Sequence, residues 1–303
     1  MDTPRAQLVA RLQSLNNVRL ERDTSYLPLV CGGAAVGLVA PEVAAQLRRY
    51  PEQLTVARDR VTLAPAADTS EAARTAALAL VMADLRDRGV FPAALAGWRA
   101  EGYDIRNRFS EAALFRLERA ASPLLGVRKY GVQVTGWVRH SSLGTCVWLQ
   151  QRAASKPTWP GMMDNFVGGG VTEGLGVAQT AVKEAAEEAG VEAALASQLV
   201  AAGSVSFLHR TERGLHPNTE FVFDLELPED WAPRNTDGEV CGWELVPAAT
   251  LLEVACSDRF KITSVPVVVD WLTRHGLLAP DPELEAMLRV PLDTLYDYFN
   301  PPR

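Results

Sequence analysis

Three glutamates in one short segment have the spacing of a cation-binding site. Glu184, Glu187 and Glu188 stand at positions i, i+3 and i+4 of a segment, 177–189, whose pattern is helical. On a helix this spacing places all three carboxylates on one face within a single turn. Like charges this close repel one another, whereas a hard divalent cation such as Mg²⁺ takes carboxylate oxygens as ligands. The triplet therefore indicates a divalent-metal site, and the alternative is an acidic helix face in solvent.

Glycines border this helix on both sides. Residues 168–176 are rich in glycine and are expected to form a loop, and Gly190 follows the helix as a typical C-terminal cap. The opposite face of the helix carries small apolar residues: Val177, Ala181, Val182 and Ala185. The pattern predicts a helix that packs on a sheet and presents its glutamates outward.

The segment 168–191, GGGVTEGLGVAQTAVKEAAEEAGV, resembles the Nudix box of Nudix hydrolases. That signature reads G-x5-E-x7-R-E-U-x-E-E-x-G-U, where U is a bulky aliphatic residue. The matching residues are Gly169, Glu184, Glu187, Glu188, Gly190 and Val191. Lys183 stands where the signature has arginine, Leu175 where it has its first glutamate, and Ala185 at an aliphatic position.

The departures at Leu175 and Lys183 concern residues that are partners in the family. Changing both removes the pair together, whereas losing one alone would strand a charge. Glu173, two residues before Leu175, is an alternative partner for Lys183. The three glutamates that would bind metal are kept, so we expect catalysis.

The resemblance implies a role for each of these residues. Water would attack phosphorus in a diphosphate, with Mg²⁺ or Mn²⁺ held by Glu184, Glu187 and Glu188 and by the backbone carbonyl of Gly168. A later loop usually supplies a base or a fourth carboxylate, and Glu239 in the segment DGEVCGW is our candidate. Glu184 is the alternative base, and a turn residue in solvent is the alternative reading of Glu239.

Three residues before the box are candidates for contact with the substrate. Arg152 and Lys156 lie where cations would clamp phosphate oxygens, although charged residues also serve solubility alone. Trp159 would stack on a heteroaromatic ring of the substrate, or pack in the core instead.

Longer segments indicate a particular group within the Nudix family. Residues 156–170, 217–228 and 237–246 are similar to Nudix proteins related to thiamine pyrophosphokinase, in which a domain of uncharacterised role precedes the Nudix domain. That similarity implies hydrolysis of thiamine diphosphate, or of its oxo and oxy analogues, to the monophosphate. Two alternatives remain: a nucleoside-diphosphate-linked substrate, and a catalytically weak Nudix-like binding module, which the residues at positions 175 and 183 suggest.

The charge of the chain divides it into two parts. Its 303 residues carry a net charge of −7, yet residues 1–122 contain no lysine and sum to +2, whereas residues 123–303 sum to −9. The first part is predicted to be a small α+β accessory domain with hairpins at Gly32-Gly33 and at 58–60. It also has a helix from Ser70 to Gly89, and a second near 110–120.

The second part, residues 123–303, is rich in strands. Strands are predicted at 132–140, 143–152, 221–228 and 240–247, and a C-terminal helical tail near 281–299 would pack on the body or on a second subunit. The resemblance implies a Nudix α/β/α sandwich with a mixed sheet, preceded by the small α+β domain. A homodimer remains an alternative to a monomer.

Composition excludes several partners. The negative net charge argues against nucleic acid and against anionic membrane surfaces. The most apolar stretch, 26–47, is interrupted by Pro28, adjacent glycines and Pro41, so we expect no membrane span. The N-terminus lacks the apolar core of a signal peptide. These features favour a cytoplasmic enzyme acting on a small molecule.

Overall fold

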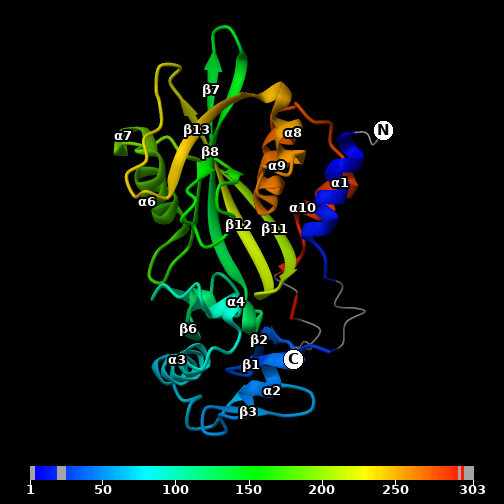
Figure 1. The fold of residues 1–303 in the computed structure, drawn as a ribbon, viewed down its shortest axis with the longest axis vertical. Coiled ribbons are helices and arrows are strands. Elements are labelled where there is room, and N and C mark those ends of the chain that lie inside the picture. Colours follow the sequence, from blue (N-terminus) through cyan, green and yellow to red (C-terminus); the bar gives the residue numbers. More distant parts are fainter. Residues whose placement is uncertain (1–3, 19–24, 293–294, 297–303) are drawn as a thin grey trace.

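The computed structural model describes residues 4–18, 25–292 and 295–296. Two bodies lie one above the other along the long axis of the molecule (Figure 1). The larger body contains a central sheet with helices on both faces, and the smaller body contains the first hairpins and a long helix. Within the described residues, none of the helices combines the length and the apolar character needed to cross a bilayer.

The larger body is an α/β/α sandwich around a seven-stranded mixed sheet. Five strands run in the order β11-β12-β7-β8-β13, with β10 paired to β7 and β9 paired to β8. Strands β12 and β7 are parallel, whereas the other neighbours are antiparallel. The bounds are β7 Lys129–His140, β8 Gly144–Arg152, β9 Met163–Asp164, β10 Val167–Gly170, β11 Val200–Thr211, β12 Gly214–Leu227 and β13 Val240–Pro247.

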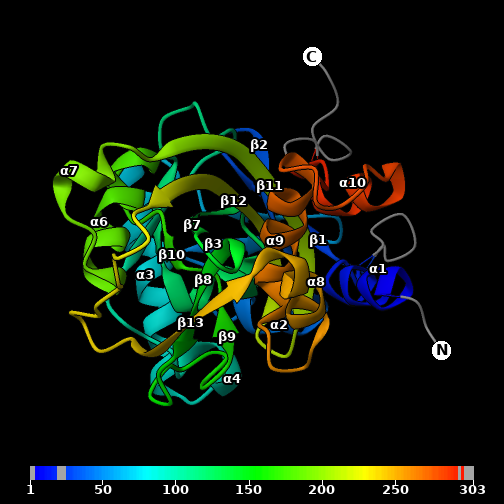
Figure 2. The same cartoon turned by 90° about the horizontal axis from the view of Figure 1, so that it is seen from above.

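Helices cover both faces of this sheet (Figure 2). One face carries α6 (Val177–Ala189) and α7 (Ala193–Ala196), and the alanines of α6 are buried against strand residues such as Val132 and Val167. The other face carries α8 (Ala248–Cys256), α9 (Val265–Arg274), α10 (Pro282–Leu288) and α1 (Pro4–Leu15). These two layers confirm the predicted sandwich.

The smaller body is α+β, as predicted. Its four-stranded sheet has the order β2-β1-β4-β3 and is accompanied by a separate pair, β5 and β6. The strands are β1 Leu27–Cys31, β2 Ala34–Val39, β3 Leu54–Val56, β4 Val61–Leu63, β5 Gly102–Ile105 and β6 Phe115–Glu118. The helices are α2 Pro41–Leu47, α3 Glu71–Asp87 and α4 Pro92–Leu95, and short turns of helix at η1 Arg119–Ala121 and α5 Ser122–Leu125 lead into β7.

Local signals in the smaller body are confirmed. The turn between β1 and β2 has φ of +58° at Gly32 and +82° at Gly33, a conformation that glycine adopts without strain. The Ser70 hydroxyl accepts a hydrogen bond from the Ala73 backbone N–H at 3.1 Å and caps α3.

Two predicted elements are wrong. Residues 110–120 do not form a helix, because Phe115 and Leu117 are buried on one face of strand β6 while Arg116 is exposed. The glycine-rich segment is not a loop throughout, since β10 (Val167–Gly170) pairs with β7 and only the residues after it connect to α6.

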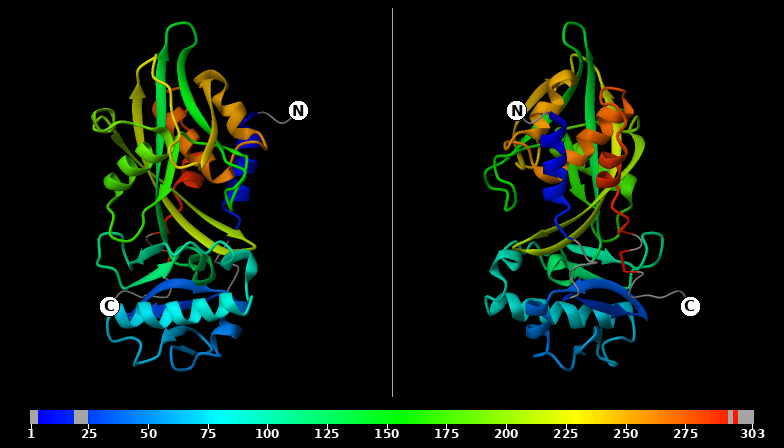
Figure 3. Two further views of the ribbon diagram at one scale, coloured as in Figure 1. Left: turned by 60° about the vertical axis from the view of Figure 1, so that its left-hand side comes forward. Right: turned by 90° about the vertical axis from the view of Figure 1, so that its right-hand side faces the viewer.

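The first and last helices pack together on the larger body (Figure 3). Leu8 and Leu12 of α1 are buried in the same core as Trp271, and Leu284 and Leu288 of α10 join them. The tail predicted near 281–299 is helical only over α10, Pro282–Leu288. Beyond it, Leu292 and Tyr296 are buried in a cluster that includes Leu38 of β2 and Leu208 of β11. The remaining residues of the tail, 293–294 and 297–299, lie outside the described residues. Helix α1 belongs to the larger body by packing, so residues 1–122 are not one packing unit. The boundary at residue 122 stays a prediction.

Candidate active site

A cleft of about 930 Å³ lies between the two bodies. The larger body contributes residues of β7, β10, α6, the β11–β12 hairpin and the loops before β9 and β13, and the smaller body contributes residues 97, 99–103 and 119–120. Glu184 and Glu187 line this cleft together with Glu239. The structure thus brings carboxylates from two distant segments to one cavity, whereas Glu188, the third glutamate of the triplet, does not line it.

Helix α6 positions the glutamates because its two faces differ. Ala181 and Ala185 are fully buried on the sheet, so the polar face of the helix turns to the cleft. Gly190, with φ of +69°, ends the helix in the left-handed conformation. The helix and its cap are therefore confirmed, but Val182, expected on the packing face, is 41% exposed, and Glu188, expected to point outward, is buried.

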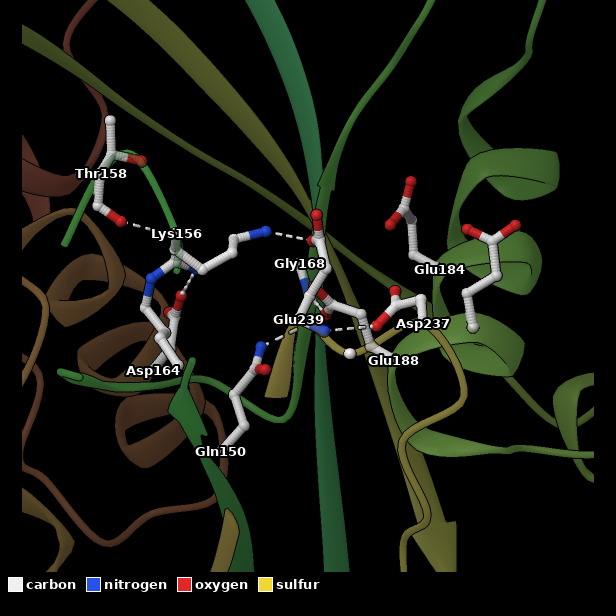
Figure 4. Close-up of polar contacts among 12 residues, drawn as sticks. Gln150, Lys156, Thr158, Asp164, Gly168, Glu184, Glu188, Asp237 and Glu239 are labelled. Atoms are coloured by element: carbon white, nitrogen blue, oxygen red, sulfur yellow. Dashed lines mark hydrogen bonds and ion pairs between the residues drawn. The ribbon is translucent and has the colours of Figure 1, made fainter. Parts of the chain in front are cut away.

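Glu188 lies between the helix and the sheet and is only 2% exposed. Its Oε2 accepts hydrogen bonds from the Gly168 backbone N–H at 3.0 Å and from Gln150 Nε2 at 3.2 Å (Figure 4). Burial, with a smaller contribution from the neighbouring carboxylate of Glu184, raises the pKa of Glu188 to about 8. Burial likewise raises the pKa of Glu184. Burial disfavours the charged form of both groups, and a cation that takes oxygen ligands would stabilise that form.

The glycines of β10 allow these side chains to approach the strand. A Cβ at residue 169 would lie 2.3 Å from Glu184 Cδ, and one at residue 168 would lie 2.7 Å from Gln133 Nε2. Neither glycine has a positive φ. These positions therefore require glycine for space and not for a turn.

Two lysines pair with the carboxylates of the cleft. Lys183 Nζ lies 2.6 Å from Glu187 Oε2 and 3.4 Å from Glu184 Oε1, and Lys156 forms an ion pair with Glu239 (Figure 4). In the part of the chain that the structure describes, no three metal-ligating side chains converge into a ready-made site. The oxygen donors fit a divalent cation, which would compete with the ammonium groups for them.

Glu173, the alternative partner of Lys183, points elsewhere. Its carboxylate lies 3.8 Å from Arg116 of the smaller body, and its backbone N–H donates to Gly102 O at 3.0 Å. The loop before α6 thus contacts strands β5 and β6, and Lys183 pairs with Glu187 and Glu184 instead.

Arg152 and Trp159 both line the cleft, but the donors of Arg152 are engaged within the protein. Its NH1 donates to Asp164 Oδ2 at 3.0 Å, and its other nitrogens donate to the carbonyls of Thr158 and Trp159 at 2.9 and 3.1 Å. Arg152 therefore holds the loop that carries Lys156 and Trp159. The substrate contacts of all three residues stay predictions, as do the ligand role of the Gly168 carbonyl and the base role of Glu239.

Sequence reasoning missed several residues of the cleft. Asp237 lines it two positions before Glu239, and its closeness in sequence was the available signal. Arg99, Tyr103 and Arg119 come from the smaller body, in which no catalytic pattern is legible. Only the fold brings these three residues to the box.

Two family profiles together match most of the chain. A family profile described as "NUDIX domain" matches residues 129–264, and one described as "Domain of unknown function (DUF4743)" matches residues 7–129. Among solved structures, DR0079 from Deinococcus radiodurans is similar with a TM-score of 0.42 and 23% identity, over 56% of this chain and 98% of that one.

Two curated relatives cover most of the chain. "Nudix hydrolase 20, chloroplastic" of Arabidopsis thaliana is 35% identical over 86% of this chain and 71% of its own length. "Nudix hydrolase 24, chloroplastic" of the same plant is 34% identical over 88% and 72%. This chain belongs to the Nudix hydrolases, enzymes that act on small molecules and generally use a divalent metal.

Proposed function

We propose that this enzyme is a Mg²⁺-dependent pyrophosphohydrolase that converts thiamine diphosphate, or its oxidised analogues, to the monophosphate. Mn²⁺ would serve as an alternative metal. The observation that carries the chemistry is the buried Glu188 beside Glu184, which lines the cleft, with the pKa of both carboxyl groups raised by burial. The assignment of the substrate rests on the resemblance of residues 156–170, 217–228 and 237–246 to thiamine-related Nudix proteins.

The residues of the cleft divide the work of hydrolysis. Water attacks one phosphorus, a P–O bond of the diphosphate breaks, and the proton of the water passes to Glu239, with Glu184 as the alternative base. The ion pair with Lys156 holds Glu239 at the cleft. When substrate binds, a phosphate oxygen would replace Glu239 as the partner of the Lys156 ammonium group. A divalent cation bound by the glutamates would neutralise the diphosphate and polarise the bond that breaks.

Phosphate release from thiamine diphosphate and its oxo and oxy analogues tests this function directly. We expect turnover with Mg²⁺ or Mn²⁺ and none with EDTA. The same assay with a panel of nucleotide sugars tests the second substrate class, and the class with the higher kcat/KM is the preferred substrate. Lack of turnover of every thiamine compound would overturn the substrate assignment. Binding without turnover at high Mg²⁺ and Mn²⁺ would identify a binding module, for which the pairing of Lys183 with Glu187 is the supporting observation.

A cytoplasmic location and a homodimer also stay proposals. Sedimentation of the purified full chain measures the oligomeric state, and microscopy of the tagged protein in its own cells measures its location. A single monomeric species, or signal confined to another compartment, would contradict the corresponding proposal.

A further inference from the structure

The smaller body reaches the Nudix box itself. Tyr103 of β5 is buried against β10, since a Cβ at Gly170 would lie 2.7 Å from its hydroxyl oxygen. Arg99 and Arg119 line the same cleft as Glu184 and Glu187. The wall that faces these glutamates therefore belongs partly to a different body.

Arg119 is held in place by its own body. Its NH1 donates to Glu101 Oε2 at 2.8 Å, its backbone N–H donates to Glu101 O at 2.9 Å, and its guanidinium carbon lies 5.8 Å from the centre of the Tyr103 ring. The fields of Tyr103, Glu101 and Glu184 all raise the pKa of Arg119 above its usual value. The Arg119 guanidinium group is therefore positively charged and held in a fixed position near the Nudix box.

Arg213, in the turn between β11 and β12, adds a second charge. A Cβ at Gly97 would lie 2.8 Å from Arg213 NH2, so this guanidinium packs on the smaller body. Its Nε is buried and has no hydrogen-bond partner within the described residues. Burial lowers the pKa of Arg213, and the charges of Arg119 and Arg99 lower it further. Glu212 opposes this lowering, but Arg213 forms no ion pair with it or with another acid among the described residues, so a ligand would supply the missing partner.

Lys129 and two histidines lie on the same side of the cleft. Burial lowers the pKa of Lys129 to about 7, with Arg119 and Arg213 among the causes. Its Nζ lies 2.8 Å from His216 Nδ1, and His209 also lines this wall. Basic groups with mutual repulsion are therefore concentrated here.

The carboxylates nearby balance the charge of Arg119 and part of that of Arg99, but they form no ion pair with Arg213 among the described residues. Glu101 pairs with Arg119, and Glu239 pairs with Lys156 and lies 3.9 Å from Arg99. Glu220 is buried and accepts from Asn218 Nδ2 at 2.8 Å, whereas Glu212 is exposed. An anion would relieve the repulsion that these side chains leave uncompensated.

We propose that Arg99, Arg119 and Arg213 form a phosphate-binding wall, which takes the phosphoryl group of the substrate that faces away from the glutamates. Guanidinium groups suit this task because their forked donors match phosphate oxygens. The domain of unknown function is then part of the active site. The inference rests on the proposed function only in that the substrate carries a diphosphate.

Binding of inorganic pyrophosphate to the EDTA-treated full chain tests the wall without turnover or metal. By calorimetry we expect measurable binding to the wild type, and affinity at least about tenfold weaker for both Arg119→Gln and Arg213→Gln. Arg213→Gln is the cleaner variant, because no ion pair of Arg213 occurs within the described residues. Arg58→Gln is the matched control, since Arg58 is exposed between β3 and β4 and does not line the cleft.

The outcomes separate this wall from a structural contact and from the proposed function. If the arginines only join the two bodies, the variants lower Tm and leave pyrophosphate affinity unchanged, which overturns the proposal. Undetectable binding to the wild type, or equal weakening by Arg58→Gln, also overturns it. With active substrate we expect KM to rise more than kcat falls in Arg119→Gln, and Arg119→Lys to recover part of the loss. Pyrophosphate binding without turnover of thiamine compounds would support the phosphate-binding wall and contradict the proposed substrate.

Discussion

Glu188 lies in a place where the protein itself offers little to balance a negative charge, and its pKa of about 8 reflects this. The Gly168 N–H and the Gln150 amide orient one of its oxygens, and burial leaves the carboxylate dependent on a bound cation. We expect Glu188→Gln to keep the hydrogen bond from Gly168, because an amide oxygen also accepts, but to bind the cation poorly. Hydrolysis should slow at least about a hundredfold, ~3 kcal/mol of barrier, in steady-state assays with Mg²⁺.

Glu192→Gln is the matched control for this variant. Glu192 is exposed just before α7 and lies outside the cleft, so the same change of charge should leave kcat unaltered. Full activity in Glu188→Gln would contradict the role of Glu188 as a ligand. Equal losses in both variants would point to net charge as the cause.

Lys129 couples stability to pH. Its pKa is about 7 in the folded protein but about 10.4 in an unfolded chain, so between these values only the unfolded chain binds the proton. The contribution of Lys129 to the free energy of unfolding therefore rises with pH and is lost as pH falls towards 7. His216 does not mask this effect, because burial lowers its pKa well below the usual value.

Replacing Lys129 isolates that contribution. Relative to wild type, Lys129→Met should gain about 1–3 kcal/mol of unfolding free energy on going from pH 9 to pH 6. Arg119, Arg213 and Glu220, the charged groups that act on Lys129, are retained in the variant. Urea unfolding at the two pH values measures the difference. A difference that does not change with pH would show that Lys129 is charged in the folded state.

Strand β10 matters for the site because its glycines leave room for the Glu184 and Gln133 side chains. We expect Gly169→Ala to displace the Glu184 side chain, because the new Cβ would lie 2.3 Å from its Cδ. Because the obstructing atoms belong to the end of a flexible side chain, the cost in stability should be about 1 kcal/mol or less, whereas kcat should fall. Gly242→Ala on β13 is the control, since its Cβ would meet nothing closer than 3.5 Å. Retained activity in Gly169→Ala would show that Glu184 does not need its observed position.

The elements differ in how well the sequence predicted them. The helix with its three glutamates and Gly190 was predictable because spacing and cap are local signals. The sequence predicts a loop where β10 forms, because glycines have no side chains that would reveal a period of two. The predicted helix at 110–120 is wrong, although the alternation of Phe115 and Leu117 with Arg116 is the signal of a strand.

The wall of the cleft was beyond sequence reasoning for a different reason. Arg99 and Arg119 stand singly in a region of many arginines, and nothing local distinguishes them from surface charges. Their proximity to Glu184 follows from the docking of β5 and β6 on the loop before α6, a contact between segments far apart in the chain. Glu239 was predictable only because the resemblance directs attention to a later loop.

At the scale of the molecule, the two ends of the described chain stabilise the same body. Arg5 of α1 pairs with Asp281 and Glu283 at 2.8 and 2.7 Å, and Asn16 donates to Met287 O at 2.8 Å. Helix α1 thus crosses from the start of the sequence to the far face of the sheet and packs beside α9 and α10. The larger body depends on residues that precede the smaller body in the chain.

Leu12→Ala tests that dependence, because Leu12 is fully buried in the core that contains Trp271. Loss of its side chain should lower the free energy of unfolding by about 2–5 kcal/mol. Leu80→Ala provides the control, since Leu80 of α3 is 53% exposed and its loss should cost little. Urea unfolding measures both, and kcat per folded molecule should not change, because Leu12 does not line the cleft. If Leu12→Ala were as stable as Leu80→Ala, the sandwich would not depend on α1 as a layer. That result would favour residues 1–122 as a separate domain.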